Sequence, residues 1–308
     1  MPLPALKRAV ERALVRSGVA GIAARHTGSR VLILAYHNII PDGQSLTGDR
    51  SLHLPLRVLR QQLDALTRTC DVVALEDAFG PGASSGLPRV VITFDDAYRG
   101  AVTCGVEELA RRGMVATIFV APGLLGDQTF WWDEAGAGSP QGLDPTYRDG
   151  ALQGCRGEAS ESRRWLAQQG VPLRPDLLPP AARSAGVEEL VAAVELHPGL
   201  TLGAHSWSHP NLAALPESRL AEEVRRPLQW LRAHFARVTV PWLAYPYGLE
   251  SPAVRRAAEA AGYTGALRVS GGRLTRGAEP SFAVPRMNVP SGLSADGFLL
   301  RVSGAFRP

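Results

Sequence analysis

The sequence lacks the features that mark a membrane-spanning protein or one built around disulfides. No apolar run approaches the roughly 18 residues that a membrane span needs. The 3 cysteines form no C-x-x-C pair and no even set, which argues against a disulfide framework. Hydrophobic residues make up 45% of the 308 residues and charged residues 20%, as is ordinary for a soluble globular protein. The composition therefore argues against a disordered or membrane-embedded chain.

Lysine is nearly absent, and acidic residues are scarce near the N-terminus. Lys7 is the one lysine among the 33 basic residues, and residues 1–30 hold six cations against Glu11 alone. That segment therefore carries +5, and the rest of the chain must sum to −1 to give the formal net charge of +4. Because the basic excess is confined to this segment, we expect no nucleic-acid partner.

Residues 1–30 show the pattern of a basic amphipathic helix. Apolar residues recur at helical spacing between the cations, at Leu3, Leu6, Val10 and Leu14. The segment has no uninterrupted apolar core of the signal-peptide kind, so we expect it to be retained and the protein to be cytoplasmic. The helix could pack on the body of the protein with its charges in water, or it could lie on an anionic membrane at the inner face.

Apolar strands alternate with helical segments through residues 31–308, which we interpret as a single domain. Buried-strand runs lie at 31–36, 71–75, 89–94, 115–121, 200–204, 238–244, 263–267 and 282–284. Helical patterns lie at 55–69, 187–196, 216–235 and 251–262, and another ends near Arg112. This alternation predicts a parallel sheet covered by helices, with enough strands to close a β/α barrel. Residues 122–185 are predicted to be a long surface excursion with one helix near 162–169.

Polar and aromatic residues follow several of the predicted strands. In a β/α barrel the carboxyl ends of the strands gather on one face, where active sites are built. Residues that are far apart in the sequence could therefore share one pocket. The candidates after strand ends are His37, Asp95, Asp96, Trp131, Trp132, Asp133, Glu134, His205, His209 and Tyr247.

The acidic pair and the two histidines suit a metal ion. Asp95 and Asp96 follow a buried strand, where two carboxylates cannot both ionise cheaply without a nearby positive charge. His205 and His209 are four residues apart, so one turn or tight loop could point both rings the same way. With one carboxylate they would make the three-ligand set common in catalytic zinc sites, which also suits iron, cobalt or nickel. Alternatively, both histidines are surface or cap residues.

Three motifs carry a resemblance to a known family. They are T-F-D-D at 93–96, H-S-W-S-H at 205–209 and A-Y-P-Y-G at 244–248, with A-T-I-F-V at 116–120 between the first two. Together they resemble the NodB-like polysaccharide deacetylases over about residues 37–286, and the A-Y-P-Y-G form resembles the exopolysaccharide deacetylase branch. The resemblance implies a deformed (β/α) barrel of about seven strands and metal-dependent removal of N-acetyl, or less often O-acetyl, groups from sugars.

Matched residue by residue, the resemblance assigns roles within these motifs. It implies that Asp96, His205 and His209 hold one divalent metal, Zn²⁺ or else Co²⁺, Ni²⁺ or Fe²⁺, and that Asp95 is the general base. A metal polarises the acetamide carbonyl and acidifies water, so an adjacent carboxylate can accept the proton as water attacks. A backbone N–H near Tyr247 is the implied donor to the oxyanion.

Two departures from the family pattern must be compensated. In the family, the third motif usually begins with an arginine that orients the base, but this sequence has Ala244 at that position. We predict that Arg286 takes the place of the missing arginine. Alternatively, Arg286 is exposed or forms a salt bridge elsewhere. The late L-x-H motif is absent, since no histidine follows His234. We predict His37 as the acid because it ends a buried strand and resembles the N-terminal Y-H motif of the exopolysaccharide branch. Alternatively, it is a structural histidine.

Aromatic residues could form the sugar site. The F-W-W-D-E stretch at 130–134 resembles one common in this branch, where Trp131 and Trp132 could stack on sugar rings and Asp133 could accept hydroxyl hydrogen bonds. Alternatively, both tryptophans anchor the excursion to the core. Tyr98 is predicted to lie on the rim.

The sequence therefore predicts an N-deacetylase acting on an N-acetylhexosamine in a glycan or a nucleotide- or lipid-linked intermediate. A non-catalytic glycan-binding relative and a metal-dependent amidase on a non-sugar amide are the alternatives.

Overall fold

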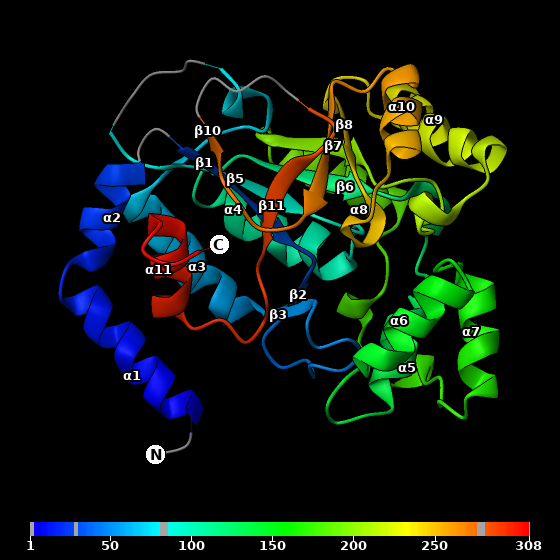
Figure 1. The fold of residues 1–308 in the computed structure, drawn as a ribbon, viewed down its shortest axis with the longest axis horizontal. Helices are drawn as coiled ribbons and strands as arrows, with labels where there is room; N and C mark the ends of the chain where they lie inside the picture. The colour runs from blue at the N-terminus through cyan, green and yellow to red at the C-terminus, as the bar shows by residue number, and fades with distance from the viewer. Residues whose placement is uncertain (1–2, 28–29, 81–85, 276–280, 308) are drawn as a thin grey trace.

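Seven parallel strands close into a barrel in the computed structural model, which describes residues 3–27, 30–80, 86–275 and 281–307 (Figure 1). The ring is closed because β1 pairs with both β5 and β11. The seven strands in ring order are β1 (Arg30–Tyr36), β5 (Arg89–Phe94), β6 (Ala116–Val120), β7 (Leu200–Ala204), β8 (Thr239–Ala244), β9 (Gly265–Val269) and β11 (Val284–Asn288). The predicted barrel, with about seven strands, is confirmed.

The barrel strands are apolar on both faces because each face packs against a core. Val31 and Ile33 of β1 belong to the cluster inside the barrel, together with Phe119 and Trp242. The alternate residues of β1, among them Leu32, belong to the larger cluster beneath the surrounding helices. This double burial explains the continuous apolar runs in the sequence, which are typical of parallel strands covered on both sides.

Two short strands deform the barrel at its amino-terminal end. β4 (Asp71–Val72) pairs with the first half of β5, so β6 reaches β5 only at Thr93 and Phe94. Similarly, β10 (Leu274–Thr275) pairs antiparallel with the start of β1, and β11 joins β1 only at Leu34 and Ala35. The ring is therefore complete at the carboxyl ends of the strands, where the candidate residues lie.

Helices cover the barrel where the apolar spacing predicted them. The predicted helices at 55–69, 187–196, 216–235 and 251–262 are all present. The helix predicted to end near Arg112 is α4 (Val106–Ala110), which follows a π-helical turn at Ala101–Gly105. The last helix, α11, was not predicted. The covering helices are α3 (Leu56–Thr69), α4 (Val106–Ala110), α8 (Val187–Leu196), α9 (Glu217–His234), α10 (Pro252–Ala260) and α11 (Ala295–Ser303).

The excursion at 122–185 is more ordered than the sequence predicted. It holds α5 (Trp131–Ala137), α6 (Pro145–Gly154) and α7 (Ala159–Gln168), which lie together at one side of the barrel (Figure 1). The helix predicted near 162–169 is present as α7, but α5 and α6 were not predicted. Every residue of α5 is buried, including Asp133 and Glu134, so the helix has no exposed side and its sequence has no amphipathic periodicity to detect.

Two helices occupy the N-terminal segment instead of the single one expected. α1 (Leu3–Arg16) and α2 (Val19–Thr27) are separated at Gly18, whose φ is +82°. Both pack against α11, which in turn packs on α3 (Figure 1). After β1, the chain forms β2 (Asn38–Ile40), which pairs with β3 (His53–Pro55). Among the described helices, none is both long and apolar enough to cross a membrane.

Candidate active site

A cavity of about 180 Å³ opens at the carboxyl ends of the barrel strands. Most of the predicted site residues line it, although they come from segments more than two hundred positions apart. Its lining includes His37, Asp95, Asp96, Trp131, Trp132, His205, His209 and Tyr247, together with Asp49, Leu52, Arg148, Leu152, Gly248, Val269 and Asn288.

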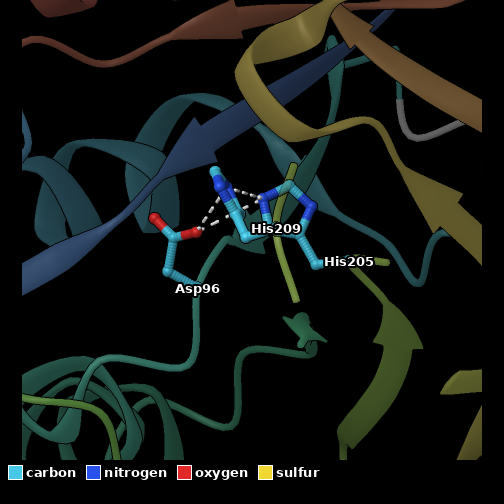
Figure 2. Close-up of side chains that lie close together, drawn as sticks. All are labelled: Asp96, His205 and His209. Carbon is cyan, nitrogen blue, oxygen red and sulfur yellow. Dashed lines mark hydrogen bonds and ion pairs between the residues drawn. The ribbon is translucent and has the colours of Figure 1, made fainter. Parts of the chain in front are cut away.

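Three buried side chains converge in this cavity (Figure 2). Asp96 Oδ1 lies 3.3 Å from His205 Nε2 and 3.0 Å from His209 Nε2, and the two nitrogens are 3.2 Å apart. Metal–ligand bonds of about 2.0–2.1 Å in a tetrahedral arrangement place ligand atoms about 3.3 Å apart. Asp96 Oδ1 is also buried without a hydrogen-bond partner. The triangle therefore fits a small divalent cation.

Unusual backbone geometry separates the two aspartates. Asp95 continues the strand by donating its N–H to Tyr36 O, whereas Asp96 adopts a φ of 68°. This left-handed conformation, uncommon outside glycine, turns Asp96 toward the histidines. Burial alone would raise the pKa of Asp96, but His209 and His205 hold it well below its usual value. Asp95 and Asp96 are adjacent in the sequence, but their side chains can therefore have different partners.

The orientation of His205 is fixed from behind. Its Nδ1 donates to Ala244 O at 2.8 Å, which leaves Nε2 as the atom that faces Asp96. Ligating histidines usually donate their other ring nitrogen in this way. The neighbouring strand β8 therefore fixes the orientation of the His205 ring, whose Nε2 could bind a metal.

Glu223 of α9 braces the loop that carries both histidines. Its Oε2 accepts the N–H groups of Trp207 and Ser208 at 3.0 and 2.9 Å, and its Oε1 accepts the Ser208 hydroxyl at 2.7 Å. Arg226, also on α9, lies 3.6 Å from the centroid of the Trp207 ring. Sequence reasoning missed this contact, because nothing in the pattern distinguishes Glu223 from Glu222.

Arg286 holds Asp95 through both carboxylate oxygens. Its Nη1 and Nη2 donate to Asp95 Oδ1 and Oδ2 at 2.7 Å each, and Nη1 also donates to Thr93 Oγ1 at 3.1 Å. Burial alone would raise the pKa of Asp95, but Arg286 and His205 lower it below its usual value. Because Arg286 is fully buried, the alternative of an exposed arginine is excluded.

His37 lines the same cavity at the end of β1. Burial lowers its pKa, although Asp95 and Asp96 oppose that effect. The other described histidines outside the metal triangle lie elsewhere. His26 is exposed on α2, His53 bonds to Asp133, His197 to Met114 O and His234 to Trp230 O. Among the residues that the structure describes, His37 is therefore the one histidine placed to reach a bound substrate beside the triangle.

The expectations for Asp133 and Tyr98 are wrong. Asp133 is fully buried, and its oxygens accept from Asp49 N, His53 Nε2 and the Tyr98 hydroxyl at 2.8, 2.9 and 2.6 Å. Tyr98 is also fully buried, so it cannot form the rim. Its hydroxyl instead accepts Trp132 Nε1 at 2.8 Å. These groups support the cavity wall from behind and do not line it.

Aromatic rings form that wall. Trp132 lies with its centroid 5.0 Å from the His209 ring, and Tyr247 lies 4.6 Å from the same ring. Tyr247 has a φ of 58°, so the A-Y-P-Y-G segment turns sharply beside the triangle. Trp131 and Trp132 both line the cavity and pack into the core, as expected of residues that anchor the excursion. Their stacking on a sugar ring stays a prediction.

Three polar residues in the cavity were not foreseen. Arg148 of α6 forms a close ion pair with Asp49, and Asn288 ends β11. Asn288 Oδ1 is buried without a hydrogen-bond partner. Arg148 lies in the excursion, and Asp49 lies between the predicted strand at 31–36 and the predicted helix at 55–69, where the sequence offered no periodicity to place them. Asn288 was identifiable only by its position at a strand end.

Comparison with known proteins agrees with the fold. Similar solved structures include the Streptococcus pyogenes deacetylase PplD in complex with acetate (TM-score 0.61, 16% identity, 88% of this chain and 96% of that one). They also include IcaB from Ammonifex degensii (TM-score 0.61, 18% identity, 91% of this chain and 98% of that one). A third is the polysaccharide deacetylase BC0361 from Bacillus cereus (TM-score 0.60, 14% identity, 89% of this chain and 69% of that one). Identities this low establish the fold alone.

Sequence comparison establishes the family. A search of curated proteins gave no match. The family model described as polysaccharide deacetylase matches residues 83–266, more than half of the chain. The matched region contains the T-F-D-D, H-S-W-S-H and A-Y-P-Y-G motifs, whose side chains meet in the cavity. The chain belongs to the polysaccharide deacetylase family.

Proposed function

We propose that this protein is a metal-dependent hydrolase that removes the N-acetyl group from an N-acetylhexosamine in a glycan or sugar intermediate. Family membership supports deacetylation of a carbohydrate. The observation that carries the finer proposal is the pairing of two adjacent carboxylates with different partners. Asp96 meets His205 and His209, while Asp95 is held by Arg286 beside the same cavity.

Asp96, His205 and His209 are the residues that would hold the metal, with Zn²⁺ the first candidate and Co²⁺, Ni²⁺ and Fe²⁺ the alternatives. When bound, such an ion supplies a Lewis acid that polarises the acetyl carbonyl and lowers the pKa of water. The rest of the chemistry belongs to the protein. Asp95 accepts the proton of the attacking water, and Arg286 keeps that carboxylate ionised and correctly aimed.

The leaving amine and the developing oxyanion each need a partner. His37 donates a proton to the amine nitrogen, and a backbone N–H near Tyr247 donates to the oxyanion. Trp131, Trp132 and Tyr247 form an aromatic wall that can pack on a sugar ring. The Asp49–Arg148 pair offers charged partners to sugar hydroxyls at the same cavity.

Acetate release tests this proposal. The purified protein is stripped of metal, reloaded with Zn²⁺, Co²⁺, Ni²⁺ or Fe²⁺, and offered N-acetylglucosamine oligomers or nucleotide-linked N-acetyl sugars. We expect acetate from at least one N-acetyl sugar, and none from the stripped protein. Binding of the oligomers without acetate would favour a non-catalytic glycan-binding protein. Turnover of a cyclic imide or simple amide alone would favour the amidase. O-acetylated sugars, assayed in parallel, show whether the amide or the ester is preferred.

Location is part of the same proposal. We place the enzyme in the cytoplasm, with the N-terminal helices in peripheral contact with the inner face of the membrane. The motivating feature is the cationic, amphipathic character of that segment. Fractionation of the native cells, with the protein followed by an antibody, tests the location. Recovery in the medium or on the outer surface would contradict it.

A further inference from the structure

Helix α1 buries its acidic residue and exposes two of its large apolar residues. Its one acidic residue, Glu11, is 2% exposed, whereas Leu6 and Val10 are 52% and 50% exposed. A helix that served only to cover the barrel would turn its apolar side inward. Here Leu14 and Val15 are half-buried, whereas Leu6 and Val10 point away from the protein.

The contacts of Glu11 explain this orientation. Its Oε2 accepts the hydroxyl of Ser294, the N-cap of α11. A carboxylate is stabilised at such a helix N-terminus, where backbone N–H groups are unpaired. Glu11 therefore fixes the side of α1 that faces α11, and the opposite side is left outward.

The outward side of α1 forms an apolar strip with cations beside it. Leu6, Val10 and Ala13 follow one another at spacings of four and three residues, so they share one side of the helix. All three are exposed. At 100° per residue, Arg16 and Lys7 lie about 60° beyond the two edges of this strip, and Arg12 lies about 40° beyond Arg16. These three cations are also exposed, and Arg12 has only a 3.9 Å approach to Asp296.

Helix α2 adds further exposed apolar residues, Val19 at 36% and Ile22 at 60%. Of the 9 large apolar side chains that are exposed among the described residues, 4 lie on α1 and α2. The others are distributed over the rest of the described chain. The two N-terminal helices therefore carry a concentration of exposed apolar groups within the same segment that holds the basic excess.

We propose that α1 and α2 form a surface that binds the interface of an anionic lipid bilayer. Leu6, Val10 and Ile22 enter the boundary between headgroups and acyl chains, while Lys7, Arg12 and Arg16 contact lipid phosphates. Amphipathic helices with a basic polar face bind membranes through these two contributions. The described helices are too short or too polar to span, so the contact is peripheral.

Charge favours a membrane over a second copy of the chain. Two copies that met through this surface in a symmetric dimer would bring their own cations together, and no exposed acid of α1 would neutralise them. Anionic headgroups supply the missing negative charge. A partner recognised by phosphate contacts alone would leave Leu6 and Val10 in water.

Sedimentation with vesicles tests this surface, using the full-length protein. We expect it to sediment with vesicles of phosphatidylcholine mixed with phosphatidylglycerol, to sediment far less with phosphatidylcholine alone, and to be released by high salt. The double substitution Leu6→Gln/Val10→Gln should weaken partition about 30-fold, since two apolar side chains at about 1 kcal/mol each contribute about 2 kcal/mol, and about 1.4 kcal/mol is tenfold. Arg12→Gln/Arg16→Gln should do so comparably, at about 1 kcal/mol per cation.

Matched control variants distinguish an effect of the α1–α2 surface from a general effect of removing exposed apolar or cationic side chains. Leu177→Gln/Leu196→Gln removes two apolar residues that are 42% and 56% exposed elsewhere. Arg57→Gln/Arg68→Gln removes two exposed cations of α3. Both should partition like the wild type, and all variants should keep the wild-type melting temperature.

Three results would overturn the proposal: no sedimentation with anionic vesicles, equal loss in the control pairs, or a dimer abolished by Leu6→Gln/Val10→Gln with no vesicle binding. Because the vesicle assay needs no catalysis, it fails or succeeds independently of acetate release.

Discussion

Arg286 and Asp95 are 191 positions apart, yet their side chains form a buried ion pair with two hydrogen bonds beside the cavity. The family motif usually supplies an arginine from the position that Ala244 occupies, on β8. Here the small Ala244 side chain packs inside the barrel, and the guanidinium comes from β11 instead. Because the strands form a closed ring, a side chain on another strand can reach the same carboxylate.

Replacing Arg286 should therefore impair the chemical step more than substrate binding. We expect Arg286→Met to lower kcat by a factor of about 10² or more, since proton transfer by a well-positioned group contributes about 10²–10⁴. KM and bound metal should change little. Arg286→Lys should recover part of kcat, because it restores the charge without the two-point contact. Equal kcat in both variants and the wild type would remove Arg286 from the mechanism.

His37 is the acid in this account, and its variant should show a loss of a different kind. We expect His37→Ala to lower kcat about 10²-fold or more while metal content stays at the wild-type level. An acid is lost as pH rises through its pKa, so the alkaline fall of kcat/KM in the wild type should disappear in the variant. Burial lowers the pKa of His37, which places that fall at lower pH than for a solvent-exposed histidine. An unchanged alkaline limb would assign it to another group.

At the scale of elements, α9 both covers the barrel and shapes the histidine loop. Ser206 and His209 have φ values of 61° and 60°, so the H-S-W-S-H loop is not a relaxed turn. Its consecutive N–H groups need acceptors, and Glu223 Oε2 accepts two of these N–H groups, from Trp207 and Ser208. The loop is also held on its other side, where Gly123 N donates to Trp207 O at 2.9 Å.

Glu223→Gln should therefore weaken metal binding. A neutral amide can accept fewer of these hydrogen bonds, and groups behind metal ligands typically contribute 10–100-fold in affinity. We expect a rise of about tenfold or more in the metal Kd, measured by competition with a chromogenic chelator, with little change in kcat at saturating metal. Glu222→Gln, at an exposed neighbour paired with Arg225, is the matched control. Equal Kd values in the two variants would refute the role of Glu223.

Glu108 joins α4 to α3 through buried charge. It accepts from Arg60 of α3 at 3.0 Å and from Arg112 at 2.6 Å. Burial alone would raise the pKa of Glu108, but its bonds to Arg112 and Arg60 lower it below the usual value. A carboxylate with a lowered pKa stabilises the folded state above its unfolded pKa, and this stabilisation is lost as pH falls through the folded pKa.

Glu108→Gln should accordingly lower the urea midpoint at pH 7, by an amount equivalent to about 1–3 kcal/mol. The difference in urea midpoint between the variant and the wild type should become smaller below about pH 4, because the wild-type carboxyl becomes protonated. Glu107→Gln, at the half-exposed neighbour, should cost much less. If the difference in urea midpoint did not change with pH, the charge of Glu108 would not be the source of the stabilisation.

At the scale of the whole molecule, the sequence predicted what depends on local pattern. The double-sided burial of β1 and β5 produces continuous apolar runs, and the one-sided burial of α9 produces helical spacing, so these elements were found. The burial of α5 on all sides removes that signal, and the two-residue strand β10 is set by its pairing with β1.

The site divides in the same way. Motif residues such as Asp96 and His209 were identified because their order and their place after strands are visible in the sequence. Asp133 and Tyr98 were misplaced because depth of burial depends on how the excursion folds back on the barrel. Glu223 and Arg148 were missed because their contacts join segments whose proximity only the closed barrel creates.

The central claim is that Asp96 holds a metal while Asp95 moves a proton. Acetate release and bound metal, measured together on the wild type, Asp95→Asn and His205→Ala with an N-acetylglucosamine oligomer, test it most directly. The account predicts one metal per chain and turnover in the wild type, one metal and at least a 10²-fold slower rate in Asp95→Asn, and loss of both metal and turnover in His205→Ala. Wild-type turnover in Asp95→Asn, or full metal content in His205→Ala, would contradict the division between the two aspartates and their partners.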